Sequence, residues 1–345
     1  MNPGDQTTLA DLMPSIERLI GQSTQSDAKV VSTGAVSGGC INSAISCELE
    51  NGKCYFVKYN NDMRGVFRLE AHGLEAIRAT TAFRTPDVIG VGETESGVEF
   101  LVLEFISGAS KPDDFFEMFG RQLAQMHQAN DQESRYGFVS DNFIGSTPQK
   151  NKWHNDWTVF FAVERLGFQL KLANHNGLAN PELNKRCDNL IEQLGRFIDS
   201  PAEPPALLHG DLWSGNYLVS QDGGPVLIDP AAYFGARESE FGMIRLFGGF
   251  NSGFITPTMR FIRWPMVGSC EPRFISFTIC STISIYLALV TCRSVYKSYE
   301  SLIDVLQMFF VGAACSFMPP RLQEIDQPCG SRFQRGSICD IQRRF

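Results

Sequence analysis

The sequence has no run of basic residues and no closely spaced pair of cysteines. Lys and Arg total 30 against 38 for Asp and Glu, which gives a net charge of −8 and a pI of about 5.3. Nucleic-acid-binding surfaces are usually basic, so this balance argues against nucleic acid as a partner. None of the ten cysteines stands in a C-x-x-C pair, so we expect reduced thiols and no zinc site.

The first residues also lack the features of a secretory signal. Residues 1–6 have neither a basic start nor an apolar core, and acidic Asp5 and Asp11 precede the first arginine, Arg18. We therefore expect a cytoplasmic protein, with an organelle as the alternative. At 345 residues and 43% apolar content, the chain can form one large domain or two lobes.

A polar loop between short apolar stretches dominates the middle of the chain. Leu207 and Leu208 precede the loop 209–216, and the apolar residues 217–219 follow it. A glycine-rich turn at 222–224 leads to another apolar stretch, which ends at Asp229. This pattern predicts short strands on both sides of an exposed polar loop.

Three side chains of this region suggest phosphoryl transfer. Asp211 and Asn216 stand five residues apart in the loop, and Asp229 closes the following strand. Protein kinases use this order: one Asp accepts the proton of the attacking hydroxyl, while an Asn and a second Asp hold Mg²⁺ against the nucleotide phosphates. Each residue alone could be a cap in a polar hairpin. The ordered set predicts kinase-type chemistry with ATP and Mg²⁺.

A glycine turn and a lysine upstream fit the same chemistry. The turn at 36–44 lies between predicted strands, and glycines there would let the backbone approach phosphate closely. Lys58 closes the apolar strand 54–59 and would hold phosphate; the alternatives are an ordinary turn and a strand lysine that reaches solvent. The predicted nucleotide-binding residues here are Gly38, Gly39, Cys40, Ile41, Asn42 and Lys58.

A helix and a strand would complete the nucleotide site. The helix through 67–77 offers two acidic partners for Lys58, Glu70 and Glu75. The apolar strand 100–106 ends in Glu104, Phe105 and Ile106, which in the kinase fold would form the hinge whose backbone pairs with adenine. An ordinary buried strand would have the same sequence pattern.

Other helices are predicted at 8–22, 115–130, 160–172 and 180–198. His127 lies beside the apolar stripe of the second helix and is interpreted as structural. The connection 136–157 contains several aromatic residues, which either stack on a sugar or pack between lobes. These residues are Tyr136, Phe143, Trp153 and Trp157.

The residues at the motif positions resemble those of small-molecule kinases. His-Gly-Asp-Leu-Trp-Ser-Gly-Asn at 209–216 is similar to aminoglycoside and choline kinases, and Asp-Pro-Ala at 229–231 replaces the Asp-Phe-Gly of protein kinases. Trp213 and Ile-Asp-Pro-Ala-Ala-Tyr at 228–233 resemble the fructosamine kinase (ketosamine-3-kinase) family more closely. The segments Gly-Ala-Arg-Glu and Phe-Gly-Gly-Phe, at 235–238 and 247–250, support the same family.

The resemblance, which covers residues 9 to about 250, implies an α+β, protein-kinase-like fold with two lobes. Residues 1–105 would form a small lobe with an antiparallel sheet, and 106–250 a mainly helical lobe. It also places the acidic partner of Lys58 at Glu70, and brings Trp213 to the acceptor.

The resemblance further implies ATP-dependent phosphorylation of ketosamines, on glycated proteins or as small molecules, at O3. Breakdown of the phosphorylated adduct would free the lysine, which is protein deglycation. Such a protein would be a monomer or a homodimer linked by oxidation of Cys40, a position where the family often has cysteine.

Two alternatives remain open. One is a kinase for another small molecule, such as an aminoglycoside or choline. The other is an inactive, pseudokinase-type protein, because residues 251–345 depart from the family pattern. The uncharged run 274–292 is long enough for a membrane helix, but its many Ser, Thr and Cys residues favour an aberrant C-terminal segment over a span.

Overall fold

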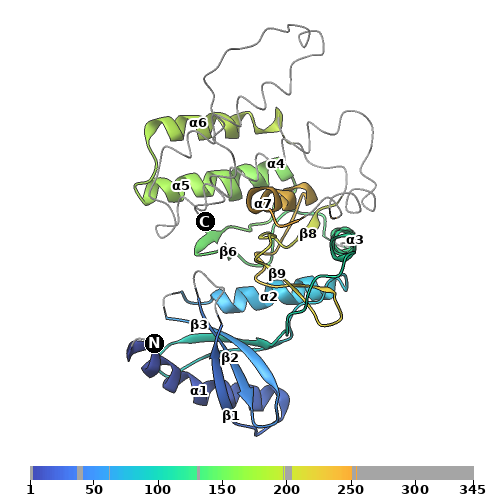
Figure 1. Cartoon of the computed structure of the whole chain (residues 1–345). Coiled ribbons are helices and arrows are strands. Elements are labelled where there is room, and N and C mark those ends of the chain that lie inside the picture. The colour runs from blue at the N-terminus through green and yellow to red at the C-terminus, as the bar shows by residue number, and fades with distance from the viewer. Residues whose placement is uncertain are drawn as a thin grey trace, which may run out of the picture.

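The computed structural model describes residues 3–36, 42–61, 63–129, 133–196, 198, 204–250 and 254. The predictions for Gly38, Gly39, Cys40 and Ile41 fall outside these residues, as do those for the C-terminal run 274–292. In Figure 1 a sheet with helix α1 lies at the bottom, a group of helices lies at the top, and short strands lie between them. No helix within the described ranges is long and apolar enough to cross a membrane.

The N-terminal part is a five-stranded, wholly antiparallel sheet in the order β1-β2-β3-β5-β4. Successive residues of each strand point to opposite faces of the sheet, and β5 has four consecutive buried apolar residues, Phe100 to Leu103, because both faces are covered. The bounds are Val30–Ala35 (β1), Ser43–Leu49 (β2), Cys54–Asn60 (β3), Val88–Glu93 (β4) and Glu99–Glu104 (β5).

Two helices cover the two faces of this sheet. Helix α1 (Pro3–Thr24) buries a stripe that includes Leu12 and Ile16 against Val57 and other residues of one face. Helix α2 (Val66–Ala79) packs on the opposite face, where Phe67, Leu74 and Leu101 are fully buried. Because successive strand residues point to opposite faces, Lys58 lies on the face of α2 whereas its neighbour Val57 lies on the face of α1.

The C-terminal part is mainly helical, and its core is rich in aromatic residues such as Trp157, Phe115 and Phe119. The predicted helix 160–172 is in fact a continuous helical stretch of three segments, the middle one a π-helix. The helices are Phe115–Gln128 (α3), Trp157–Phe160 (α4), the π-helical Phe161–Gly167, Phe168–His175 (α5), Pro181–Glu192 (α6) and Glu240–Phe247 (α7). A short 3₁₀ turn at Leu194–Arg196 follows α6, and another at Arg237–Ser239 precedes α7.

Short ribbons hold the polar loop 209–216. Strand β8 (Ala206–Leu208) precedes the loop and pairs with β11 (Tyr233–Gly235), while β9 (Tyr217–Val219) follows it and pairs with β10 (Pro225–Leu227). The strands that flank the loop therefore do not pair with each other. A simple polar hairpin is the wrong interpretation of this stretch, because each strand belongs to a separate ribbon.

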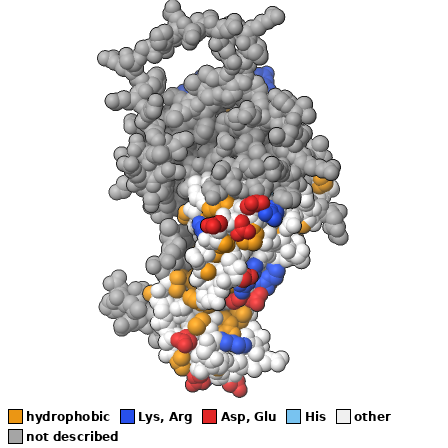
Figure 2. All heavy atoms as spheres, turned by 45° about the vertical axis from the view of Figure 1, so that its right-hand side comes forward, with side chains coloured by type: hydrophobic (Ala, Val, Ile, Leu, Met, Phe, Trp, Pro, Cys, Tyr) orange, Lys and Arg blue, Asp and Glu red, His pale blue; other side chains and the backbone are white. Residues whose placement is uncertain are grey.

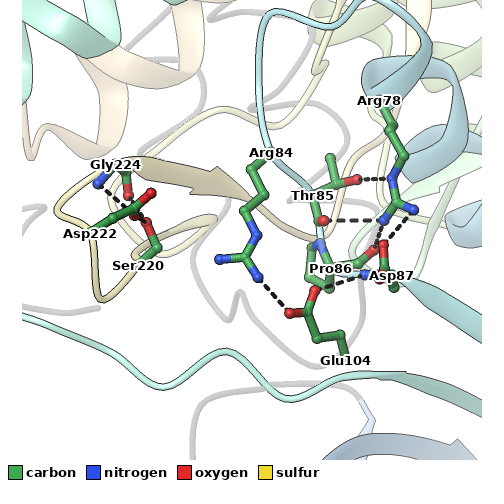
Figure 3. Close-up of polar contacts among 9 residues, drawn as sticks. All are labelled: Arg78, Arg84, Thr85, Pro86, Asp87, Glu104, Ser220, Asp222 and Gly224. Atoms are coloured by element: carbon green, nitrogen blue, oxygen red, sulfur yellow. Dashed lines mark hydrogen bonds and ion pairs between the residues drawn. The ribbon is translucent and has the colours of Figure 1, made fainter.

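The segment between α2 and β4 belongs to the N-terminal part and contacts the C-terminal part through hydrogen bonds. The Leu227 N–H of β10 donates to the Arg84 carbonyl at 3.0 Å, and the Arg84 side chain pairs with Glu104 at 2.5 Å (Figure 3). Arg78 of α2 binds the Pro86 carbonyl at 2.6 Å and Asp87 at 2.6 Å, which holds the same segment from the other side (Figure 3). The antiparallel sheet and the mainly helical part that follows it confirm the predicted α+β architecture.

Candidate active site

A cavity of about 470 Å³ lies between the sheet and the helical part, a size typical of small-molecule sites. It is lined by nearly all the predicted site residues that fall in the described ranges; Trp213 is the exception. The predicted residues at the cavity are Asn42, Lys58, Glu70, Glu104, Phe105, Ile106, Asp211, Asn216 and Asp229. The structure thus brings together residues that are up to 187 positions apart in sequence, from Asn42 to Asp229.

Lys58 is a buried cation between two carboxylates. Its Nζ lies 2.8 Å from Glu70 Oε1 and also donates to Asp229 Oδ1. Burial alone would lower the pKa of Lys58, but Glu70 and Asp229 outweigh it and raise the pKa above its ordinary value. The lysine therefore stays charged. Glu75, the other acidic residue considered, is exposed on α2.

Asp211 and Asn216 form a second polar pair. The Asn216 Nδ2 donates to the Asp211 carbonyl at 2.8 Å and to Asp211 Oδ2 at 2.9 Å. Asp211 Oδ1 is buried and has no hydrogen-bond partner in the described part of the protein. Burial raises the pKa of Asp211 to about 8, although the bond from Asn216 acts in the opposite direction. Once Asp211 is deprotonated, its unoccupied oxygen Oδ1 can accept a proton from a bound hydroxyl.

The raised pKa of Asp211 has a consequence for stability. In the unfolded chain an Asp ionises near pH 3.9, whereas folded Asp211 keeps its proton up to about pH 8. Between these values the folded state binds the extra proton, so the contribution of Asp211 to stability falls as pH rises. We expect Asp211→Asn to stabilise the metal-free protein progressively from pH 5 to pH 8, by on the order of a few kcal/mol at most. Urea denaturation at both pH values measures this, and a difference that does not change with pH would contradict it.

Glu240 supports the loop that carries Asp211. Its two carboxylate oxygens accept the N–H groups of His209 at 2.7 Å and Gly210 at 3.1 Å. The His209 ring is fully buried, which lowers its pKa, and its Nε2 lies 2.9 Å from the Ile228 carbonyl. A neutral ring that donates to Ile228 ties the loop to the residue that precedes Asp229.

Glu240 is a residue that the sequence reasoning missed. Its only signal is an acidic residue in the first turn of α7, which a favourable charge at a helix N-terminus explains equally well. His127, interpreted as structural, is buried with its Nε2 3.7 Å from Glu240. It does not line the cavity.

Gly210 is required by its backbone conformation and by its surroundings. Its φ is +81°, and a Cβ at this position would overlap the Ala231 carbonyl oxygen. Gly52, in the β2–β3 turn, has a similar φ of +78° but open space around it. We expect Gly52→Ala to cost about 1 kcal/mol for the left-handed conformation and Gly210→Ala about 2 kcal/mol more for the overlap. Urea denaturation of both variants measures the difference, and equal losses would contradict the tight contact with Ala231.

The oxygen atoms at the cavity suit a hard cation. Because the amide nitrogen of Asn216 faces Asp211, the oxygen of the same amide faces away from it, and Asn216 lines the cavity with Asp229. Among the described residues no three His, Cys, Asp or Glu side chains gather as a metal cage. Mg²⁺ does not need one, since it is usually bound by one or two carboxylates together with substrate phosphates. The residues present therefore fit Mg²⁺.

The predicted hinge also borders the cavity, with one correction to its secondary structure. Strand β5 ends at Glu104, so Phe105 and Ile106 do not belong to the strand predicted over 100–106. Their backbone groups lie beyond the sheet ladder, whose last pair on this strand joins Glu104 to Tyr55. The hinge backbone at these two positions is therefore not used for sheet pairing.

The aromatic residues of the connection 136–157 divide between the two interpretations left open. Phe143 lines the cavity, whereas Trp157 is fully buried and stacks on Phe160 in the helical core. Trp153 is half-buried under the guanidinium of Arg135, which lies 4.8 Å from its ring centre. Trp213 is half-buried against Gly215, a residue of the cavity wall, and its predicted contact with the acceptor stays a prediction.

Comparison with known proteins identifies similar sequences. The family model for fructosamine kinase matches residues 12–262, so it reaches beyond residue 250. A chloroplastic protein-ribulosamine 3-kinase of Oryza sativa subsp. indica is 42% identical over 217 residues, 62% of this chain and 62% of the relative. A Synechocystis protein named probable ketoamine kinase is 38% identical over 242 residues, 70% of this chain and 79% of the relative. The chain thus spans 62% of the length of the rice relative that it matches.

Solved structures share the fold. A provisionally described fructosamine-3-kinase from Haemophilus somnus 129PT superimposes with a TM-score of 0.75 at 24% identity, over 86% of this chain and 97% of that one. A second such protein, from Thermobifida fusca YX-ER1, gives 0.70 at 26% identity, over 86% and 99%. An aminoglycoside phosphotransferase in complex with AMP-PNP and hygromycin B gives 0.56 at 17% identity, over 87% and 95%. The predicted kinase-like fold is confirmed.

Proposed function

The chain belongs to the fructosamine kinase family, and we propose on this basis that it transfers phosphate from ATP to a hydroxyl of a ketosamine. The observation that carries the proposal is the arrangement of five polar side chains around one cavity. A buried lysine between two carboxylates faces an Asp–Asn pair whose Asp has a free oxygen. These residues are Lys58, Glu70, Asp211, Asn216 and Asp229.

Each residue has a role that its surroundings support. Lys58, held by Glu70, binds the nucleotide phosphates, and Asn216 and Asp229 hold Mg²⁺, which when bound neutralises phosphate charge. The acceptor oxygen attacks the γ-phosphorus, the bond from phosphorus to the ADP oxygen breaks, and the hydroxyl proton passes to Asp211. The hinge at Glu104–Ile106 receives the adenine, and Asn42 contributes to the phosphate side of the cavity.

The proposed acceptor is a ketosamine on a protein amine, such as a ribulosamine or fructosamine, phosphorylated at O3. Relatives from rice carry the name protein-ribulosamine 3-kinase, which supports this substrate class. A phosphate at O3 is a good leaving group, so the adduct then breaks down and frees the amine. The outcome would be repair of glycated proteins.

The surface and the cysteines bear on the predicted partners. Figure 2 shows acidic and basic side chains intermixed with apolar ones over the described part of one face, and on this face there is no single-sign basic field of the kind typical of nucleic-acid binding. Burial raises the pKa of the Cys47 and Cys187 thiols to about 12 and about 11, so these two are inert. The redox-linked homodimer through Cys40 stays a prediction, as does the cytoplasmic location, while the rice relatives are named chloroplastic.

A panel of acceptors tests the proposed function. Full-length protein is incubated with radiolabelled ATP, Mg²⁺ and one of several acceptors: N-α-protected fructosyl-lysine, ribulosyl-lysine, erythrulosyl-lysine, hygromycin B or choline. We expect label on the ketosamines alone. Label on hygromycin B or choline alone would indicate a kinase for another small molecule, and no label on any acceptor would indicate an inactive protein.

A further inference from the structure

A small hairpin that the chemistry above does not use lies against the loop that carries Asp229. Strands β6 (Asn142–Ile144) and β7 (Thr147–Gln149) form this hairpin. Two amide side chains at its base, Asn142 and Gln149, are 5% and 2% exposed. Buried amides need hydrogen-bond partners, so their partners show what the hairpin is for.

Both amides bind the residues that directly follow Asp229 and Pro230. Gln149 Nε2 donates to the Ala231 carbonyl at 3.1 Å and to Asn142 Oδ1 at 2.8 Å. Asn142 Nδ2 donates to the Ala232 carbonyl at 2.8 Å. Two successive backbone carbonyls are therefore held by one pair of side chains, which also bind each other.

The same short segment is tied to the Asp211 loop on its other side. The Ala231 N–H donates to the His209 carbonyl at 2.9 Å, so both backbone groups of Ala231 are occupied. Asp229 itself has a φ of +55°, a conformation that non-glycine residues rarely adopt. Such a residue persists only where its surroundings determine it. The contacts at Ala231 and Ala232 supply that constraint.

The chain that leaves the base of the hairpin is anchored in the helical part by the π-helical segment. Arg165 of this segment is 5% exposed, donates to Asn151 Oδ1 at 2.9 Å and also donates to the Lys150 carbonyl. Its guanidinium lies 4.2 Å from the ring centre of Tyr233, the residue after Ala232. π-Helical turns often occur at functional sites, and this one places a buried cation between the residues that follow the hairpin and Tyr233.

The hairpin also reaches helix α2 across the cavity wall. Phe143 and Gly145 line the cavity together with Leu69 and Glu70 of α2. Pro230 packs closely on the same helix, since a Cβ at Gly73 would lie 2.9 Å from its Cγ. The segment after Asp229 is thus enclosed by α2, the hairpin and the Asp211 loop.

We propose that Asn142 and Gln149 are positioning residues that hold Asp229 in the orientation needed to bind Mg²⁺ with the nucleotide. The inference rests on the proposed kinase function. It assigns to the hairpin a role in metal affinity rather than a role in packing alone. Residues that orient metal ligands typically change metal affinity or activity by about 10–100-fold when they are replaced.

The test compares Gln149→Met with a variant that only lowers stability. Methionine has nearly the shape of glutamine but donates no hydrogen bond, so the Ala231 carbonyl loses its donor. Leu190→Ala shortens a buried side chain of α6. This helix lies in the helical part and is distant from the hairpin in sequence. For each full-length protein, calorimetry measures the binding of AMP-PNP as a function of Mg²⁺ concentration.

We expect Gln149→Met to raise the Mg²⁺ concentration for half-maximal binding about tenfold or more and Leu190→Ala to leave it unchanged. Asn142→Leu, which removes the donor to Ala232, provides the same comparison if Gln149→Met is recovered unfolded. An unchanged Mg²⁺ dependence in the folded variant, or an equal shift in Leu190→Ala, would overturn the inference. A wild-type protein that binds no AMP-PNP at any Mg²⁺ concentration would instead overturn the kinase function on which it rests.

Discussion

Asp211→Asn is expected to lower kcat by about 100-fold or more and to leave the affinity for Mg·ATP nearly unchanged. A positioned general base typically contributes 10²–10⁴-fold, and Asn cannot accept the proton of the acceptor hydroxyl. The amide oxygen of the new side chain can still accept the Asn216 bond, which is 2.9 Å in the wild type, so the loop geometry is retained. Steady-state kinetics with fructosyl-lysine and calorimetry with AMP-PNP measure the two quantities.

The matched control for this variant is Asp222→Asn. Asp222 lies in the β9–β10 turn and binds Ser220 and the Gly224 N–H away from the cavity (Figure 3). Asp222→Asn makes the same change of side chain in the same region of the sequence, and we expect this variant to have the wild-type kcat. Full turnover in Asp211→Asn would show that another group accepts the proton, and the assignment of Asp211 would be wrong.

Asp229→Asn is expected to lower kcat/KM by at least about 100-fold, chiefly through weaker binding of Mg²⁺ and nucleotide. Asparagine tolerates the positive φ of Asp229 better than most residues, so the backbone at this position should remain in place. The change removes the charge of the carboxylate proposed to bind the metal, which is also one of the two carboxylates beside Lys58. The effect should therefore be seen as a higher KM for Mg·ATP.

Titration with Mn²⁺ as well as Mg²⁺ separates this effect from a general loss of structure. A variant that has only lost a carboxylate ligand should recover part of its nucleotide binding at high metal concentration, whereas an unfolded protein should not. A Mg²⁺ dependence equal to that of the wild type would contradict the role of Asp229.

Asp211 and Asp229 illustrate what the sequence could predict. Both residues follow or precede short apolar strands, and the spacing to Asn216 is local, so a pattern of residue types was sufficient to select them. Lys58 was selected in the same way, from its position at the end of an apolar strand. In these cases the determining geometry lies within one strand or one loop.

The choice between Glu70 and Glu75 shows where local patterns end. Five residues along a helix correspond to a rotation of about 140°, so only one of the two can face Lys58. Which one does so depends on how α2 is rotated against the sheet. That rotation is set by the burial of Phe67 and Leu74, contacts that periodicity alone does not orient toward a particular strand. The family resemblance indicated Glu70, and the ion pair forms there.

Glu240, Asn142 and Gln149 could not be identified from the sequence for a related reason. Each acts on backbone groups that lie 30 to 90 positions away, from Glu240 to Gly210 and from Asn142 to Ala232. A backbone N–H or carbonyl has no residue-type signature, so no motif reports such a contact. The same limit applies to the pairing of β8 with β11, which holds the ends of the Asp211 loop apart.

The most direct test of ketosamine phosphorylation by this protein follows the fate of a single glycated lysine. A peptide with one ribulosyl- or fructosyl-lysine is incubated with the full-length protein and Mg·ATP, and mass spectrometry with ³¹P NMR records the products over time. We expect an intermediate heavier by one phosphate, with the phosphorus coupled to the proton at C3, followed by the unmodified peptide and inorganic phosphate. Phosphate at any other position, or no phosphorylated peptide while ATP is consumed, would contradict the proposed function.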